Sequence, residues 1–167
     1  TSVPPIPVEA KGQLQATLEA RAELQSHLDS KVRPLLGRYR TEKEGYEEAL
    51  REMLPPSGIR THADLLAQKD DHLQLYNFLQ RAAILGHSIA WLEGKEKAGT
   101  RTILELEQQA WRLDKYIEMN EVAAQDELAA IQEMLVLVRA VIDDEIPVPA
   151  QQDIALLEKS IFEELSP

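Results

Sequence analysis

The 167-residue chain contains no cysteine, which excludes a disulfide bond, a thiolate zinc site and a cysteine nucleophile. Basic residues are few: 18 Lys and Arg stand against 29 Asp and Glu, so the formal net charge is −11. Nucleic acids and anionic membrane surfaces attract clustered Lys and Arg, and neither is therefore expected as a partner. Although aromatic residues make up only 5% of the chain, a 44% hydrophobic content is enough to build a buried core.

Motifs that carry catalytic or metal chemistry are also missing. The sequence has no glycine-rich phosphate loop, no nucleophile elbow and no Glu-x-x-His repeat of the di-iron bundles. Residues 70–72, which read DDH, are better explained as a solvated face, because adjacent side chains on a helix diverge. His87 lies in an apolar stretch and is expected to be a core histidine bonded to a neighbour. We therefore expect no enzymatic activity, no cofactor and no metal.

The first eight residues, from Thr1 to Val8, contain three prolines and no charged side chain. Proline fixes φ and lacks an N–H group, so this segment is expected to be extended rather than helical. It could be the mature start of an exported protein from which a signal has been removed, or an interdomain linker. Both interpretations stay open, and the first of them favours an exported or periplasmic location.

Residues 9–54 carry apolar side chains mostly three or four positions apart, which is the spacing of one helix face. Within this predicted helix, Pro34 removes one backbone hydrogen bond and crowds the carbonyl four residues earlier, so we expect a kink there. The sequence PPSG at residues 55–58 is expected to end the helix. A second helix is predicted over residues 61–93, with Thr61 as its N-cap. Its C-terminal half is apolar on most sides and is expected to be buried, whereas its polar residues make it a poor membrane span.

Residues 94–100 read GKEKAGT and favour a turn, with Gly94 beyond a helix C-terminus and Thr100 as the next N-cap. The alternative is one very long helix through this stretch. A third helix is predicted over residues 100–145, because an apolar residue recurs there in alternating steps of three and four without an intervening proline. Such a seven-residue repeat is typical of helices that pack lengthwise at a shallow angle. A short fourth helix is predicted over residues 149–165.

Short connections make successive helices antiparallel. We therefore expect an all-α fold: an elongated up-down bundle of three long helices and a short fourth, with coiled-coil-like packing. Residues 9–167 would form one domain, because a chain of this length suits a single core. The short fourth helix would leave part of the third uncovered, so that an apolar face is open to another protein or to a second copy of the chain.

Six residues are candidate partner contacts: Trp91, Trp111, Asn120, Asp143, Asp144 and Glu145. An exposed tryptophan is a frequent binding hot spot, although both tryptophans could instead pack within one layer of the core. Asn120 takes an inward position of the third predicted helix, where a buried Asn often fixes register or partner number; a position at the helix edge is the alternative. The three acidic residues follow one another at a helix C-terminus, where the macrodipole disfavours negative charge, which suggests a contact with a cation or a basic partner.

These observations predict a non-enzymatic interaction or scaffold domain that binds a protein partner, or self-associates, through exposed helix faces. An extracytoplasmic sensor domain that holds a small ligand between its helices is the alternative, since the uncharged N-terminal segment and the lack of cysteine fit it as well. No motif in the chain indicates a particular family.

Overall fold

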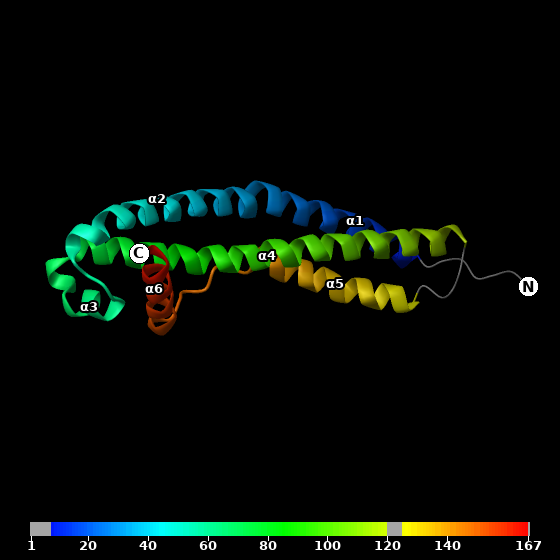
Figure 1. Ribbon diagram of the computed structural model, residues 1–167. Helices are drawn as coiled ribbons and strands as arrows, with labels where there is room; N and C mark the ends of the chain where they lie inside the picture. Colours follow the sequence, from blue (N-terminus) through cyan, green and yellow to red (C-terminus); the bar gives the residue numbers. More distant parts are fainter. Residues whose placement is uncertain (1–7, 120–124, 167) are drawn as a thin grey trace, which may run out of the picture. The chain divides into compact units, whose positions relative to one another are not determined.

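The computed structural model describes residues 8–119 and 125–166, and within these ranges it contains helices and no strand (Figure 1). The predicted all-α fold class is confirmed, and several helices pack against one another in a bundle-like arrangement. The predicted extended segment falls almost entirely on residues 1–7, outside the described residues. The elements are α1 (Val8–His27), a π-helical segment (Leu28–Val32), α2 (Arg33–Ser57), α3 (His62–Ala67), a 3₁₀ turn (Lys69–Asp71), α4 (Leu73–Glu118), α5 (Gln125–Asp143) and α6 (Gln151–Leu165).

The chain forms two compact units, each built from two separate stretches of sequence. The first unit comprises residues 1–33 and 94–145, and the second comprises residues 34–93 and 146–167. Helix α4 contributes to both, because the boundary between the units falls within it. The organisation of residues 9–167 as one domain stays a prediction.

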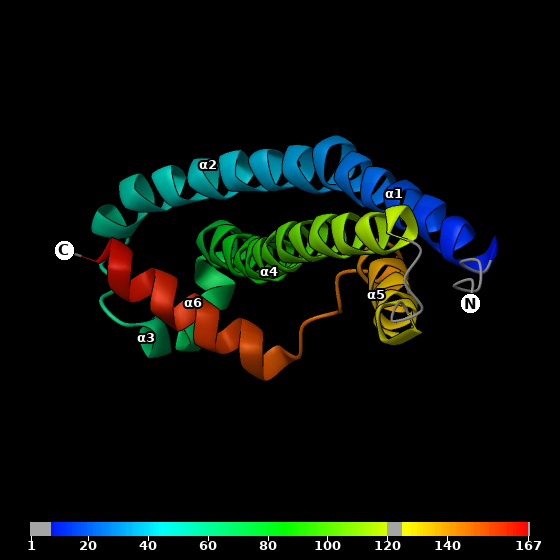
Figure 2. The same ribbon diagram turned by 90° about the vertical axis from the view of Figure 1, so that its right-hand side faces the viewer.

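Three helical segments make up the first unit: α1, the C-terminal part of α4, and α5 (Figure 2). Ala10, Leu113 and Ile131, one from each segment, are buried together in its core. Ion pairs join the segments in a fixed register: Arg21–Glu107 (2.7 Å), Arg139–Glu23 (2.6 Å) and Arg112–Glu127 (2.8 Å). Helix α1 runs antiparallel to α4, since Arg21 pairs with Glu107 whereas Leu28, further along the chain, contacts the earlier Gly99. Helix α5 is also antiparallel to α4, since Arg112 pairs with Glu127 whereas the earlier Lys95 reaches the later Asp144.

The second unit consists of α2, α3, the N-terminal part of α4, and α6. Its core includes Leu50, Leu65, Leu79 and Phe162, which come from these four helices and are all nearly inaccessible to solvent. A hydrogen bond also joins α4 to α2, since Arg81 donates to the Tyr46 hydroxyl at 3.0 Å. The Thr61 side chain accepts a hydrogen bond from the Asp64 N–H at 3.1 Å, so the predicted N-cap is confirmed.

The predicted turn at residues 94–99 is wrong, because α4 continues through it as one helix. Gly99 does not end a helix: it lets Leu28 pack closely, and a Cβ atom added at Gly99 would lie 3.0 Å from the Leu28 Cδ2 atom. The helix is also held four residues before this contact, since the Lys95 ammonium donates to the Asp144 carbonyl at 2.8 Å. These contacts within the first unit outweigh the low helix propensity of glycine, which costs about 1 kcal/mol per residue.

The predicted helix over residues 100–145 is also wrong, because α4 ends at Glu118 and a separate helix, α5, begins at Gln125. Two residues 15 positions apart in one continuous helix would lie about 22 Å from each other. Arg112 and Glu127 are this far apart in sequence and yet form an ion pair at 2.8 Å. A heptad pattern persists when a helix folds back onto itself, so the pattern could not distinguish one long helix from two antiparallel ones.

The helix predicted over residues 61–93 is interrupted in the structure. Helix α3 ends at Ala67, a 3₁₀ turn covers Lys69–Asp71, and α4 begins at Leu73. This break places the buried Leu65 of α3 in the same core as Leu75 and Leu79 of α4. Residues 68–72 contain no apolar side chain, so a continuous helix through them would bury nothing against the core.

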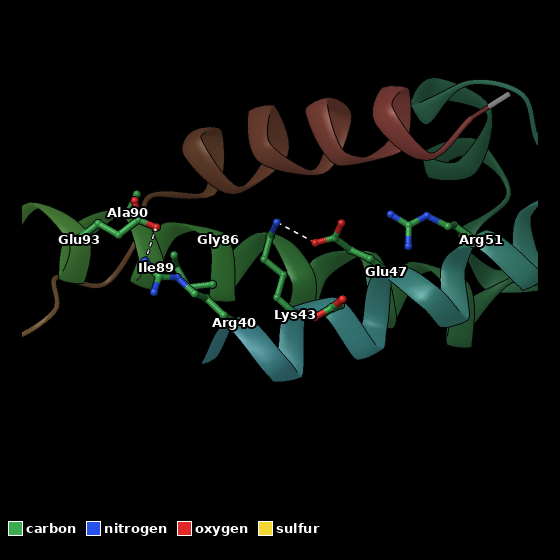
Figure 3. Close-up of a pocket in the computed structure, with 9 residues that line it drawn as sticks. Arg40, Lys43, Glu47, Arg51, Gly86, Ile89, Ala90 and Glu93 are labelled. Atoms are coloured by element: carbon green, nitrogen blue, oxygen red, sulfur yellow. Dashed lines mark hydrogen bonds and ion pairs between the residues drawn. The ribbon is translucent and has the colours of Figure 1, made fainter. Parts of the chain in front are cut away.

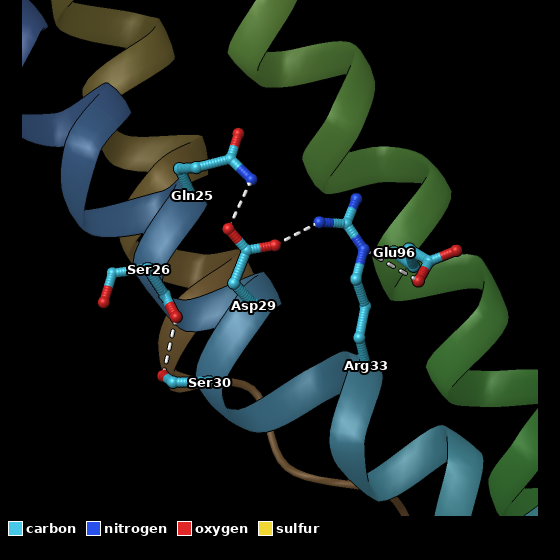
Figure 4. A network of polar contacts seen from close by, with 6 residues as sticks. All are labelled: Gln25, Ser26, Asp29, Ser30, Arg33 and Glu96. Atoms are coloured by element: carbon cyan, nitrogen blue, oxygen red, sulfur yellow. Dashed lines mark hydrogen bonds and ion pairs between the residues drawn. The ribbon is translucent and has the colours of Figure 1, made fainter.

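The predicted kink at Pro34 stays a prediction, but a π-helical segment, Leu28–Val32, lies just before this residue. There the Arg33 N–H donates to the Leu28 carbonyl, five residues back, and α2 then runs through Pro34. A wider turn just before a proline relieves the crowding of its ring against the preceding turn. Side chains brace the segment: Asp29 accepts from Gln25 and Arg33, and Arg33 also reaches Glu96 at 3.3 Å (Figure 4).

Two predicted helix ends need smaller corrections. Helix α2 does not stop at Leu54 but includes Pro55 and Pro56 in its last turn, and it ends at Ser57. Gly58 then adopts a left-handed conformation with a φ of 75°, which only glycine takes without strain. The fourth predicted helix corresponds to α6, which begins at Gln151 rather than at residue 149.

The contrast between two glycines of α4 provides a test of its continuity. Gly94→Ala is expected to raise the free energy of unfolding by about 0.5–1 kcal/mol, because Gly94 is helical and nothing lies within 4 Å of an added Cβ atom. Gly99→Ala is expected to be less stable than Gly94→Ala by about 1–3 kcal/mol, because the methyl group overpacks Leu28. Urea unfolding followed by circular dichroism measures both. A loss of stability in Gly94→Ala would contradict the continuous helix.

Candidate partner-binding groove

An open groove lies between α1 and α4 in the first unit. It has a volume of about 520 Å³, and its apolar lining comes from Leu14, Leu18, Ala110 and Trp111. The Trp111 side chain is 64% exposed and Leu18 is 42% exposed, so two large apolar side chains face solvent at the same place. Leu104, which is 55% exposed, lies seven residues before Trp111 and therefore on the same face of α4. We refer to this surface as the Trp111 groove.

Charged side chains flank the Trp111 groove. Arg21 and Glu107 pair across it at 2.7 Å, which ties α1 to α4 along its length. Lys115 lies 5.9 Å from the centre of the Trp111 ring and also pairs with Glu118. Asp114 is exposed and forms no hydrogen bond or ion pair with any residue that the structure describes. The groove therefore carries one carboxylate without a counter-ion.

The other candidate contacts lie elsewhere. Trp91 is half-buried in the second unit and makes a polar or ring contact of its own, so the two tryptophans belong to different units. Asn120 lies outside the described residues. Asp143, Asp144 and Glu145 are exposed at the end of α5, where Arg139 contacts Asp143 at 3.4 Å. Their role in binding stays a prediction, as does that of Trp91.

A second groove, between α2 and α4 in the second unit, has a volume of about 470 Å³ and is polar (Figure 3). Its ions pair with one another: Lys43 lies 2.8 Å from Glu47, and Arg40 lies 3.3 Å from Glu93. Its lining contains three cations and three carboxylates and so has no net charge, which gives this groove no preference for a ligand of either sign. We therefore regard the Trp111 groove as the better candidate site.

Sequence analysis missed a buried polar pair in the second unit, between His62 of α3 and Glu158 of α6. The His62 Nε2 atom lies 3.0 Å from a Glu158 carboxylate oxygen, and the two side chains are only 9% and 4% exposed. Burial raises the pKa of the neighbouring Tyr76 phenol, and the Glu158 carboxylate raises it further. The pair links residues 96 positions apart, and no local sequence signal could have indicated it.

The structure also gives His27 an unusual environment in the first unit. Its Nε2 atom is buried without a hydrogen-bond partner in the described structure. Burial lowers the pKa of His27, the positive charges of Lys95 and Lys31 lower it further, and Asp143 and Glu23 oppose the shift. His87 is only half-buried, so the expected core position is wrong, although its Nε2 atom does bond the Pro147 carbonyl at 3.1 Å.

Searches of the described residues add two negative findings. Residues 8–119 and 125–166 contain no cluster of three His, Asp or Glu side chains arranged to hold a metal ion. In the same part of the chain, no helix combines the length and the apolar character needed to cross a membrane. Comparison with protein-family models, curated proteins and solved structures finds no significant match to this chain.

Removing the partner of the buried Glu158 should destabilise the protein. His62→Ala leaves a buried carboxylate unpaired, and we expect a loss of about 3–5 kcal/mol in the free energy of unfolding. Glu158→Gln should lower the free energy of unfolding by less, because the Gln amide oxygen can still accept a hydrogen bond from His62. Chemical denaturation of the two variants measures both effects, and a His62→Ala variant as stable as the parent would rule out the buried pair.

The environment of His27 predicts a pH-dependent stability. Because the folded protein lowers the pKa of His27 below its ordinary value of 6.5, the unfolded chain binds a proton more readily. The free energy of unfolding should therefore fall as the pH drops below 6.5, until the lowered pKa is passed. His27→Gln should remove this part of the slope in thermal melts between pH 7.5 and about pH 5. An unchanged slope in the variant would mean that other groups cause it.

Proposed function

We propose that this chain is a protein-interaction domain without enzymatic activity, and that it binds a partner protein through the Trp111 groove. The observation that carries the proposal is the exposure of the Trp111 indole beside Leu18. Tryptophan is among the commonest hot-spot residues in interfaces. Covering the exposed part of one indole on binding would contribute on the order of 3 kcal/mol.

Electrostatics favours a different protein over a second copy of the chain as the partner. Each copy carries a formal net charge of −11, and two such chains repel each other. A role as scaffold or adaptor, and coiled-coil-like packing among the chain's own helices, belong to the same proposal. Self-association remains an outcome that the experiments below would detect.

A photo-crosslinking phenylalanine derivative at position 111 tests the proposal in the native host cell. We expect one discrete crosslinked protein, identified by mass spectrometry, and we expect that protein to bind again after both components are purified. Trp111→Ala should weaken this reconstituted binding at least about 30-fold, in line with a hot-spot residue. The variant should fold normally, because the side chain is 64% exposed.

Leu156 of α6 provides the matched control, since it is apolar and 67% exposed but lies in the second unit. The crosslinker at position 156 should not capture the same protein, and Leu156→Ala should leave its affinity unchanged. Equal affinity in the Trp111→Ala variant would refute the proposed function. If position 111 crosslinks only to a second copy of the chain, the groove is a self-association surface and the proposed binding of a different protein is wrong.

A further inference from the structure

The shape of the Trp111 groove restricts what can fill it. Its lining spans residues 14–21 of α1 and 107–114 of α4, which is two helical turns, or about 10 Å, on each side. Both walls are helices whose backbone groups are hydrogen-bonded internally, so they offer no strand edge to which an extended peptide could add. Two neighbouring helices do present ridges and grooves of side chains that accept a third helix. This geometry favours a helical occupant.

The exposed apolar side chains are spaced for contact with such a helix. On α4, Leu104 and Trp111 lie two turns apart on one face, and Leu18 of α1 stands on the opposite wall. A helix with apolar residues at positions i, i+4 and i+7 presents a stripe of the same length. Recognition of an amphipathic helix in a groove usually depends on two or three anchors of this kind.

The charges of the groove specify the polar flank of the occupant. Glu107 is neutralised by Arg21, whereas Asp114 has no counter-ion in the described structure. An apolar occupant would strip water from the Asp114 carboxylate without replacing its hydrogen bonds, which is unfavourable. A Lys or Arg beside the apolar stripe would pair with it, and the net charge of −11 would attract a basic segment from a distance.

We infer that the Trp111 groove binds an amphipathic α-helix of another protein whose apolar stripe is flanked by Lys or Arg. This inference rests on the proposed function and identifies the partner's chemistry. Trp111 and Leu18 anchor the apolar stripe, and Asp114 pairs with the basic flank. The net charge of −11 disfavours a second copy of the chain, and an acidic helix would repel the Asp114 carboxylate.

Synthetic peptides test the inference directly. The probe is an 18-residue peptide of Ala and Gln with Leu at steps of three and four and with Lys on both flanks of the Leu stripe. Two matched peptides serve as controls. In the Glu peptide each Lys is replaced by Glu, and in the Pro peptide a central Pro prevents helix formation. The Trp91→Phe variant leaves Trp111 as the only tryptophan, and its fluorescence then reports burial of the groove.

We expect the Lys peptide to shift Trp111 fluorescence to shorter wavelength and to bind at least about tenfold more tightly than either matched peptide. Asp114→Lys should lower the affinity for the Lys peptide and raise the affinity for the Glu peptide. Each change should be about two- to fivefold at low salt, which is the size expected for an exposed ion pair. Asp153→Lys, which adds the same charge on α6 in the second unit, should not reverse this preference.

Equal affinities for the Lys, Glu and Pro peptides, or no binding by any of them, would overturn the inference. The proposed function would still stand if the crosslinked partner lost affinity in Trp111→Ala, so the two failures are distinguishable. A fluorescence shift that depends only on the protein's own concentration, together with dimers in sedimentation, would also overturn it, because the occupant would then be a second copy.

Discussion

The close packing of Leu28 against Gly99 is the contact on which the first unit depends. It requires that α4 remain helical at a position where glycine would ordinarily permit a turn. With α4 continuous, Arg21 meets Glu107 and the Trp111 indole is placed beside Leu18. The apolar groove therefore depends on the register between α1 and α4, since both of its walls, residues 14–21 and 107–114, lie in the first unit.

Charge and hydrophobicity act together at this groove. Most of the acidic excess lies on exposed helix faces, where it is solvated and opposes self-association. In the Trp111 groove, a large aromatic side chain lies near the Asp114 carboxylate, which forms no ion pair with any described residue, and the basic amphipathic helix that we infer would meet both features. The lining of the groove between α2 and α4 has three cations and three carboxylates and therefore no net charge.

The sequence was sufficient to predict the all-α class and the N-cap at Thr61, since each depends on local periodicity or residue chemistry. It was insufficient where distant residues decide the outcome. Glycine propensity predicted a turn at Gly99, but the contact with Leu28 comes from another helix. The heptad repeat was read as one helix from residue 100 to residue 145, although the same repeat serves two antiparallel helices. Leu18 and Asp114 lie in one groove only because α1 and α4 bring them together.

The interleaving of the two units along the chain has a consequence for how the protein is made. All segments of the first unit have been synthesised once α5 is complete, but the second unit still lacks α6 at that stage. Its Leu50, Leu65 and Leu79 must wait for Ile161 and Phe162 to cover them. Such long-range closure slows folding and exposes apolar surface on the ribosome, so the nascent second unit is the part of the chain that chaperones would most readily engage.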